Sequence, residues 1–578
     1  MAKKVLIGAV SGILLVAAVI GVVGGVMRSQ KASSGSGDGG SQLSSSAKYV
    51  STFCQPTQYR DTCERTLSKV SNTTSPNEVI QIAINATKDA IRARFDIPDK
   101  ILKDIPSLAP NLPQRNLSML QDALTDCKQL LEDTIDFLDA TYALSDNVED
   151  LVLRSNDVVT WMTSMNLQVS SCLDGIEHPA VHQAMIKELG NSTELRSNAL
   201  SMVAQASKVL QALGIQLNTG ADSRRRLLAH EEAVYERDSE GYPTWFTTAD
   251  RKLLGQEIVT PNVVVAKDGS GTFKTINDAL NAMPATYPGR YIIYVKAGIY
   301  DEKVLIDKKK TNLFMYGDGS KKTIVTGNAN YIAGVKTDQT ASFAVQAPGF
   351  ICKNMGFRNT AGPEGHQAVA FRINADLAVL VRCRFDGYQD TLYVQSGRHF
   401  FRNCVVSGTI DFIFGGGATV LQNCLIIVRR PMDNQFSAVT AAAGDLPDEN
   451  SAIVIHNSRI LPDKRLFPDR FTLKTYLGRP WKAYAKTVVM ETLIGDLIQP
   501  DGWKAWDGEP DHCNTAYYAE FQNRGPGADT RFRVRWPAFR VINRQEAQQF
   551  TVSNLLYTPG ADWIALSGAP QIKGFRRA

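Results

Sequence analysis

Residues 383–417 read CRFDGYQDTLYVQSGRHFFRNCVVSGTIDFIFGGG and hold two similar segments, each running from a cysteine to an aspartate seven positions later. The two aspartates, Asp390 and Asp411, are 21 positions apart. One coil of a parallel β-helix uses roughly 20–25 residues, so this spacing stacks the two carboxylates on neighbouring coils, facing the same side. The stretch therefore predicts both a β-helix and a paired-carboxylate site.

The same repeat extends through the second half of the chain. Polar residues followed by a small or apolar residue recur at steps of 28, 21, 20 and 34. They are Asn354, Arg382, Asn403, Asn423 and Asn457. A β-solenoid places equivalent side chains above one another and allows insertions at its corners, whereas a β-sandwich has no reason to repeat at this interval. We predict an all-β domain over residues 255–578, folded as a right-handed parallel β-helix.

Residues 48–215 have a helical pattern instead. Apolar side chains recur at steps of three and four between Leu117 and Leu138, which places them on one helical face. Similar stripes run through residues 79–90, 152–165 and 200–213. We therefore predict an all-α domain, a four-helix bundle preceded by short helices.

The chain has nine cysteines, and no pair has the C-x-x-C spacing of a zinc site or a thioredoxin-like motif. In an oxidising compartment, two disulfides are expected in the bundle, one closing a hairpin and one joining two helices. The pairs are Cys54 with Cys63 and Cys127 with Cys172. Cys404 and Cys424 lie one predicted coil apart, and either form a third disulfide or belong to an interior ladder of reduced side chains.

Lys3 and Lys4 precede an unbroken apolar run from Val5 to Met27, which at 23 residues is long enough to span a bilayer. Residues 1–31 therefore direct the chain into the secretory route. The sequence leaves open whether they are a cleaved signal peptide or an uncleaved membrane anchor. Residues 32–47 are rich in Ser and Gly and are predicted to be a flexible tether.

Residues 216–254 lack periodicity and separate the two domains. They contain the clusters RRRLL, which includes Arg226 and Leu228, and RKLL, which runs from Arg251 to Leu254. Proteolytic nicking concentrates in exposed connectors, so we predict a processing linker. Four N-x-S/T sequons lie in the bundle and none beyond it, which predicts glycosylation there. They are Asn72, Asn85, Asn116 and Asn191.

Amide and aromatic side chains share the repeat phase of the two acids. Gln367 lies 22 residues before Gln389, which directly precedes Asp390. Glutamine amides donate the hydrogen bonds that a developing oxyanion requires. When two acids are stacked in a partly apolar groove, their pKa values move apart. One carboxyl can then be ionised while the other is protonated, which a catalytic carboxylate pair requires. The apolar surroundings come from Tyr393, Phe412 and Phe414.

The later motif LGRPW pairs Arg479 with Trp481. Arg479 can hold a carboxylate, either a catalytic aspartate or an acidic substrate, and Trp481 offers a face for a sugar ring. A buried structural salt bridge beside a core Trp would give the same motif, and composition does not choose between these interpretations.

Other chemistries lack support in the sequence. A G-x-S-x-G nucleophile elbow is missing and the seven histidines have no metal-binding spacing, so we predict no serine hydrolase, no metal and no cofactor. The formal net charge of +5 does not suggest nucleic acid as a partner but would not repel an acidic polysaccharide. The residues alone therefore predict a β-solenoid hydrolase with a carboxylate pair, acting on an acidic carbohydrate.

Five motifs within residues 256–578 resemble, in order, those of plant pectin methylesterases (pectinesterases). They are GIYDE from Gly298, HQAVAFR with Gln367, GYQDTLY with Asp390, DFIFG with Asp411, and YLGRPW with Arg479. The first third is similar to the invertase and pectin methylesterase inhibitor family, through its four cysteines, Trp161-Met162 and the CLDG that begins at Cys172. The join GYPTWFTTADRKLL is typical of two-domain precursors in which both parts occur.

The resemblance implies hydrolysis of the methyl esters of homogalacturonan in the plant cell wall, which releases methanol. By position, Asp411 is the nucleophile, and Asp390 is first the acid for departing methanol and then the base for water. Gln367 and Gln389 stabilise the oxyanion. Arg479 orients Asp411. The substrate contacts implied by the resemblance are Thr337, Gln367, Tyr393, Phe414, Arg479 and Trp481.

The resemblance also makes the basic clusters sites for a subtilisin-like protease, and the bundle an autoinhibitory pro-region of a secreted enzyme. Two departures from the family pattern stand out: TDQTASF around Thr337, and Gly416-Gly417 where many relatives have Asn-Ala. Two alternatives are a pectin depolymerase on the same fold, with the acid pair acting on a glycosidic bond, and a chain whose main product is the inhibitor bundle.

Overall fold

The computed structural model describes residues 45–68, 75–213, 260–558 and 562–576. The chain divides into two compact units, Met1–Lys48 and Tyr49–Ala578, and the second contains both the helical and the strand-rich regions. The predicted leader, most of the tether, the sequon at Asn72 and the linker with both basic clusters lie outside the described residues. Among the residues described, no helix combines the length and the apolar character needed to cross a membrane.

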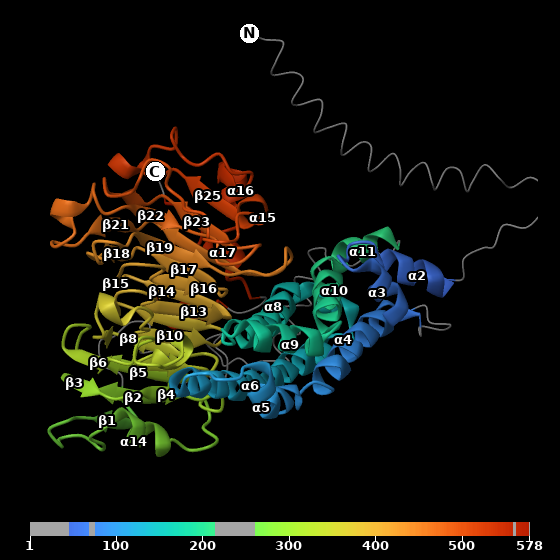
Figure 1. Cartoon of the computed structure of the whole chain (residues 1–578), viewed down its shortest axis with the longest axis horizontal. Helices are drawn as coiled ribbons and strands as arrows, with labels where there is room; N and C mark the ends of the chain where they lie inside the picture. The colour runs from blue at the N-terminus through green and yellow to red at the C-terminus, as the bar shows by residue number, and fades with distance from the viewer. Residues whose placement is uncertain (1–44, 69–74, 214–259, 559–561, 577–578) are drawn as a thin grey trace, which may run out of the picture. The chain divides into compact units, whose positions relative to one another are not determined.

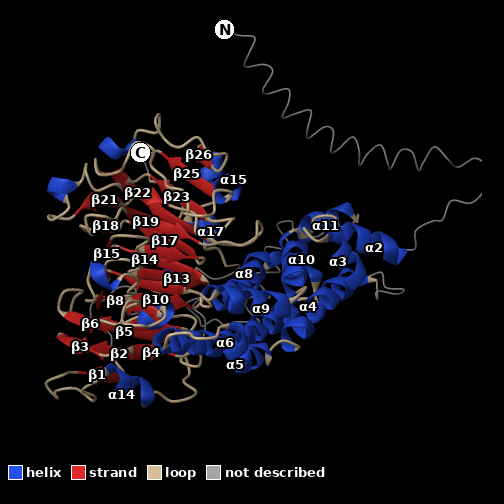
Figure 2. Cartoon of the chain, viewed as in Figure 1, coloured by secondary structure: helices blue, strands red, loops and turns tan. Residues whose placement is uncertain are grey.

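The helical region is a four-helix bundle, as the apolar stripes predicted (Figure 2). Its long helices are α4 (Pro76–Arg92), α6 (Gln114–Leu144), α8 (Ser155–Asp174) and α10 (Ser192–Ala204). Ile84, Leu131, Leu138 and Leu200 are almost fully buried, because each stripe turns its apolar face to the others. The shorter helices are α2 (Ser45–Cys54), α3 (Arg60–Leu67), α5 (Ile97–Leu108), α7 (Val148–Leu153), α9 (Pro179–Leu189) and α11 (Ala206–Ala212).

Two disulfides fasten the bundle. Cys54–Cys63 joins α2 to α3 across a short hairpin, and Cys127–Cys172 ties α6 to α8. Both predicted pairings are confirmed. A cross-link between two long helices limits the freedom of the unfolded chain, which stabilises the bundle.

The strand-rich region is a parallel β-helix of three sheets, with every strand pair parallel (Figure 1). The 7-stranded sheet contains β4 (Val304–Ile306), β7 (Phe343–Val345), β10 (Phe371–Asn374), β13 (Leu392–Ser396), β16 (Ile413–Gly415), β19 (Ser437–Ala442) and β22 (Thr475–Gly478). The 8-stranded sheet contains β3 (Gly298–Asp301), β6 (Thr323–Gly327), β9 (Gly356–Asn359), β12 (Arg384–Asp386), β15 (Val405–Gly408), β18 (Leu425–Val428), β21 (Arg459–Pro462) and β24 (Leu493–Ile494).

The 11-stranded sheet completes each coil, and its strands follow one another in chain order. They are β1 (Val263–Val265), β2 (Tyr291–Val295), β5 (Leu313–Gly317), β8 (Ile351–Lys353), β11 (Ala378–Val381), β14 (Arg398–Arg402), β17 (Ala418–Gln422), β20 (Ala452–His456), β23 (Lys486–Met490), β25 (Tyr517–Phe521) and β26 (Phe539–Val541). Short helices flank the stack: α14 (Ile276–Asn281), α15 (His512–Thr515), α16 (Arg544–Gln548), α17 (Val552–Leu555) and α18 (Trp563–Leu566).

The sequence repeat marks one corner of the solenoid, between the 11-stranded and the 8-stranded sheet. All five repeat residues have a positive φ, from 58° at Asn354 to 47° at Asn457. Asparagine tolerates this left-handed conformation better than most residues, which explains its recurrence. Glu491 and Gln522, with φ of 49° and 46°, continue the corner over two further coils. The sequence repeat did not identify them because neither is an asparagine.

The predicted disulfide between Cys404 and Cys424 is wrong, because both thiols are free and buried. They belong to the alternative, an interior ladder that also includes Cys383. The Cys404 thiol donates to the carbonyl of Leu380 at 3.4 Å, and the Cys424 thiol to that of Phe401 at 3.6 Å. Equivalent side chains of parallel coils point the same way and stay about 4.8 Å apart, whereas a disulfide holds its sulfurs at about 2.05 Å.

Candidate active site

The two acids lie at the same place on neighbouring coils. Asp390 precedes β13 and Asp411 precedes β16, and these strands pair with Tyr393 opposite Phe414, three residues beyond each acid. Both aspartates have a positive φ, 63° and 52°. Such backbone strain in a non-glycine residue costs of order 1–3 kcal/mol and is typical of functional sites. The structure therefore stacks the acids as their spacing suggested.

Arg479 binds only one of the two acids, Asp411. It follows β22 directly, and its Nε and Nη2 donate to Oδ1 and Oδ2 of Asp411 at 2.9 and 2.6 Å. Asp411 is 4% exposed and Arg479 9%, so the ion pair is shielded from water. A two-pronged arginine contact fixes a carboxylate in orientation as well as in charge. Arg479 therefore holds an aspartate of the pair, a contact that both the catalytic and the structural interpretation of LGRPW predict.

The asymmetry of Arg479 gives the two carboxyls different protonation behaviour. Burial raises the pKa of Asp390 well above its usual range, and the negative charge of Asp411 raises it further. Burial also raises the pKa of Asp411, but the hydrogen bonds and positive charge of Arg479 act against that rise. Asp411 is therefore the acid that ionises first, and Asp390 the one that keeps its proton longer.

Two glutamines flank Asp390. Ala368, the residue after Gln367, donates its amide N–H to the carbonyl of Gln389 at 3.2 Å, so the two glutamines sit on adjacent coils. Both are half-buried. The Oε1 atom of Gln367 is buried and has no hydrogen-bond partner among the described residues, so this amide end is left for a ligand.

Aromatic rings line the surface beside the acids. The rings of Tyr393 and Phe414 stack with centroids 4.3 Å apart and an angle of 9° between their planes. Trp481 lies 6.1 Å from Phe414, and Trp506 lies 6.5 Å from Trp481. The structure thus places the predicted apolar contacts Tyr393, Phe414 and Trp481 in one cluster. This surface suits the apolar face of a sugar ring.

Thr337 lies one coil before Gln367. It begins the 3₁₀ helix η1 (Thr337–Thr340), and the Oγ1 of Thr340 accepts a hydrogen bond from the amide of Val369 at 2.9 Å. In the same helix, Gln339 donates to Asp126 of α6 at 2.8 Å, whereas Asp338 pairs with Arg372 at 3.5 Å. Thr337 is therefore near the site, at the edge of the contact with the bundle.

Sequence reasoning missed two side chains of this surface, Trp506 and Arg372. The guanidinium carbon of Arg479 lies 4.1 Å from the centre of the Trp506 ring, which sandwiches the arginine between carboxylate and indole. Arg372 pairs in register with Tyr393 and donates to Gln395 at 2.7 Å. Arg372 precedes Tyr393 by 21 residues, so the repeat phase could have found it. Trp506 lies in a loop with no such phase.

Comparison with known proteins agrees with this geometry. Residues 262–559 match the family Pectinesterase, and residues 48–202 match the family Plant invertase/pectin methylesterase inhibitor. A protein of Arabidopsis thaliana named putative pectinesterase/pectinesterase inhibitor 45 is 40% identical over 532 residues, which cover 90% of this chain and 84% of that protein. The chain belongs to the pectinesterase family. It is therefore a carboxylic ester hydrolase that carries an N-terminal inhibitor-like domain.

Two further relatives support this assignment. Pectinesterase 4 of Arabidopsis thaliana is 38% identical over 608 residues, covering 99% of both chains. The solved structure of pectin methylesterase from carrot is 45% identical, with a TM-score of 0.54, and covers 55% of this chain and all of the carrot chain. Below, the pectinesterase domain means the β-helical region and the inhibitor domain means the helical bundle.

Helix α8 of the inhibitor domain covers the candidate active surface of the pectinesterase domain. Ser171 accepts a hydrogen bond from Gln395 at 3.0 Å and bonds to the hydroxyl of Tyr393. Asp174 forms an ion pair with Lys482, next to Trp481. These contacts explain why α8 is buried almost all round, with polar residues such as Asn166 and Gln168 inside. Tyr393 and Phe414 are each only 5% exposed as a result.

A buried cluster of three charged residues at the edge of this contact joins the two domains. Arg398 of β14 bonds to Asp376 of its own domain at 2.6 Å and to Asp157 of α8 at 2.6 Å. All three lie in the contact, and the side chains of Arg398 and Asp157 are each 1% exposed. Asp157 also pairs with Arg154 at 3.0 Å, so Arg398 and Asp157 each keep a second partner when one is removed. The cost of such a removal is therefore expected to stay below the roughly 3–5 kcal/mol of breaking an isolated buried pair.

Gly416 owes its place in the turn after Asp411 to the inhibitor domain. Its φ is outside the positive range in which Gly415 lies at 124°, so the backbone does not demand a glycine there. A Cβ at Gly416 would instead come within 2.4 Å of a methyl group of Leu167 in α8. The departure from Asn-Ala therefore makes room for Leu167. At Gly417 the space is filled by the ring of His399.

Replacing Gly416 by Asn is expected to raise the activity of the intact chain several-fold, because the new side chain competes with Leu167 for one space. Methanol release by wild type and variant, both unprocessed, is the measurement. Adding Leu167→Ala to the variant makes room again and is expected to return activity towards the wild-type level. Equal activity in all the proteins would show that this contact does not hold the domains together.

Proposed function

We propose that this chain hydrolyses the methyl esters of homogalacturonan in the plant cell wall by an aspartate-nucleophile, acyl-enzyme mechanism. The observation that carries the proposal is the asymmetric acid pair, with Asp411 held by Arg479 and Asp390 stacked beside it. A carboxylate kept ionised by an arginine supplies a nucleophile, and a neighbouring acid with a raised pKa supplies a proton.

In the first half-reaction, an oxygen of Asp411 attacks the C6 ester carbonyl of a galacturonate residue. Gln367 and Gln389 donate hydrogen bonds from their Nε2 groups to the oxyanion that forms. The C–O bond to methanol then breaks as Asp390 gives its proton to the departing oxygen. The product is free methanol and an anhydride between Asp411 and the sugar.

In the second half-reaction, ionised Asp390 takes a proton from water, and the hydroxide so formed attacks the sugar carbonyl of the anhydride. The bond to Asp411 breaks, and Asp411 leaves as a carboxylate that Arg479 stabilises. The site returns to a protonated Asp390 and an ionised Asp411. One ester and one water thus give one carboxylic acid and one methanol.

The experiment that tests the proposal separates ester hydrolysis from chain cleavage. Methanol, reducing ends and unsaturated products are measured on methylated pectin after the linker has been cleaved. We expect methanol with no new chain ends. Reducing ends without methanol would instead support a glycosidase on the same fold, and unsaturated products a lyase.

The pH dependence of kcat/KM is expected to have two limbs. Because the acylation step needs ionised Asp411, activity falls towards acid as Asp411 gains its proton. It also needs protonated Asp390, so activity falls towards alkaline pH as Asp390 loses its proton, and burial moves that loss well above the usual aspartate range. Asp390→Asn, which has no proton to lose in this range, is expected to be slower in both half-reactions and to lack the alkaline limb.

We also propose that the inhibitor domain is an autoinhibitory pro-region of a secreted precursor. Support comes from the α8 contacts, which occupy the surface where a sugar chain would lie. Cleavage by a subtilisin-like protease at the cluster with Arg226 or the one with Arg251 would separate the domains. Of the sequons, Asn116 and Asn191 are exposed and Asn85 is half-buried, which leaves the first two open to glycosylation.

A further inference from the structure

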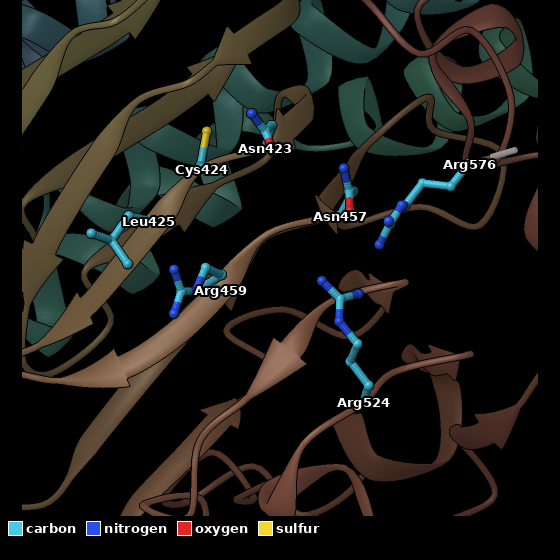
Figure 3. A pocket seen from close by; sticks show the side chains of 7 residues that line it. All are labelled: Asn423, Cys424, Leu425, Asn457, Arg459, Arg524 and Arg576. Atoms are coloured by element: carbon cyan, nitrogen blue, oxygen red, sulfur yellow. The ribbon is translucent and has the colours of Figure 1, made fainter. Parts of the chain in front are cut away.

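A second recess lies at the corner between the 11-stranded and the 8-stranded sheet, away from the 7-stranded sheet that carries the acids. Its volume is about 330 Å³. Three of its lining residues are arginines whose side chains are exposed, and Figure 3 shows those of Arg524 and Arg576 extending towards each other. We call it the arginine recess. It is lined by Asn423, Cys424, Leu425, Asn457, Arg459, Arg524 and Arg576.

The β-helix register brings the arginines together. Arg459 of β21 pairs with Leu493, and Leu493 pairs with Arg524, so the two arginines occupy one column two coils apart. At about 4.8 Å per coil, their backbones are about 10 Å apart along the solenoid. Arg576 comes from the C-terminal segment, whose amide donates to Glu491 at 3.0 Å. The arrangement is therefore built into rigid elements.

The positive charge of the recess is not neutralised within the described residues. None of its three arginines forms an ion pair there, and the one hydrogen bond from the Arg524 side chain goes to the backbone carbonyl of Glu491, at 2.6 Å. The Glu491 carboxylate is 8% exposed and is used by His456 at 2.8 Å. Guanidinium groups that share a concave surface repel one another, so the recess favours an anionic ligand.

The chemistry of the lining favours carboxylates on a sugar. Guanidinium groups match the planar, two-oxygen geometry of a carboxylate, and the amides of Asn423 and Asn457 can bind hydroxyl groups beside it. Arg459 and Arg524 lie two coils apart in one column, with Arg576 beside them in the same recess. Charges spaced along the solenoid in this way suit a chain of regularly spaced anions better than a single ion.

We propose that the arginine recess binds the carboxylates of de-esterified homogalacturonan, the product of the reaction proposed above, on which this assignment rests. The recess then holds the enzyme on its polyanionic product through a surface other than the active one. Because the inhibitor domain covers the active surface, the intact chain is expected to bind the polymer through this recess.

The test measures binding of the intact chain to fully de-esterified polygalacturonate at fixed ionic strength. The double variant Arg459→Gln, Arg524→Gln is expected to bind about tenfold more weakly or worse, since two charge-assisted contacts are lost. The control is Arg531→Gln, Arg535→Gln, which changes the net charge equally at two exposed arginines outside the recess. It is expected to bind like wild type, and unchanged melting temperatures show that all the proteins are folded.

Two results would overturn the proposal. Equal weakening by the recess variant and the control would mean that only overall charge matters. If inorganic phosphate competes with polygalacturonate as well as oligogalacturonate does at equal concentration, the recess binds isolated anions rather than a polymer. The polymer has no methyl esters, so its binding is independent of turnover. Asp411→Ala is expected to bind the polymer normally. A linker-cleaved wild-type chain that releases no methanol from methylated pectin would count against the esterase proposal alone.

Discussion

Alanine in place of Asp411 is expected to abolish methanol release, with a loss on the order of 10⁴-fold or more, as for other nucleophiles in covalent catalysis. The reason is that no other group of the acid pair is both ionised and oriented: Asp390 has the higher tendency to stay protonated, and Arg479 holds only Asp411. The rate is measured as methanol released from methylated pectin after cleavage of the linker.

This substitution also removes the partner of a buried arginine, so folding has to be checked separately. Deleting the Asp411 carboxylate leaves Arg479 with only its longer contact to the exposed Asp507, at 3.4 Å, and breaking a buried pair costs roughly 3–5 kcal/mol. Asp411→Asn keeps a hydrogen-bond acceptor at the same place, and it is expected to be inactive with a smaller loss of thermal stability. Wild-type methanol release by either variant would refute Asp411 as the nucleophile.

Aspartate in place of Leu167 is expected to activate the intact, uncleaved chain by about tenfold or more. Leu167 is 4% exposed and packs against Gly416, at the end of β16. A carboxylate there would be buried with no partner of opposite charge, and burying even an unpaired neutral polar group costs of order 2–7 kcal/mol. Tenfold needs only about 1.4 kcal/mol, so α8 is expected to leave the active surface. Methanol release before and after linker cleavage is the measurement.

The matched control for Leu167→Asp is Ile186→Asp. Ile186 lies on α9 and is 41% exposed, so the same charge there meets water and should leave the intact chain as inactive as wild type. After cleavage and separation of the domains, all three proteins are expected to have equal activity. An intact wild-type chain as active as the cleaved one would contradict the autoinhibitory role.

The β-helix could be predicted because the same residue types recur at the same position of successive coils. Asn354, Asn403 and Asn423 recur where the corner needs a left-handed backbone, and Asp390 and Asp411 share the same interval. A chain position one coil away is thus a fixed number of residues away, which converts spacing into stacking. The helices of the bundle were also predictable, because apolar residues at helical spacing mark the buried face of each helix.

What the sequence could not predict depends on contacts between distant segments. Whether Cys404 and Cys424 form a disulfide depends on the direction of their side chains within the coil, which the spacing does not give. The covering of the active surface depends on Leu167 and Ser171, which lie more than two hundred residues from their partners and share no pattern with them. Trp506 was missed because its loop is not part of the repeat.

The fit between Gly416 and Leu167 makes this inhibitor domain and this pectinesterase domain a matched pair. A pectinesterase domain with asparagine at the equivalent place has no space for the Leu167 side chain. This inhibitor domain is therefore expected to bind its own pectinesterase domain more tightly than the asparagine-containing one. Selectivity of this kind comes from a missing side chain on one domain rather than from an added contact.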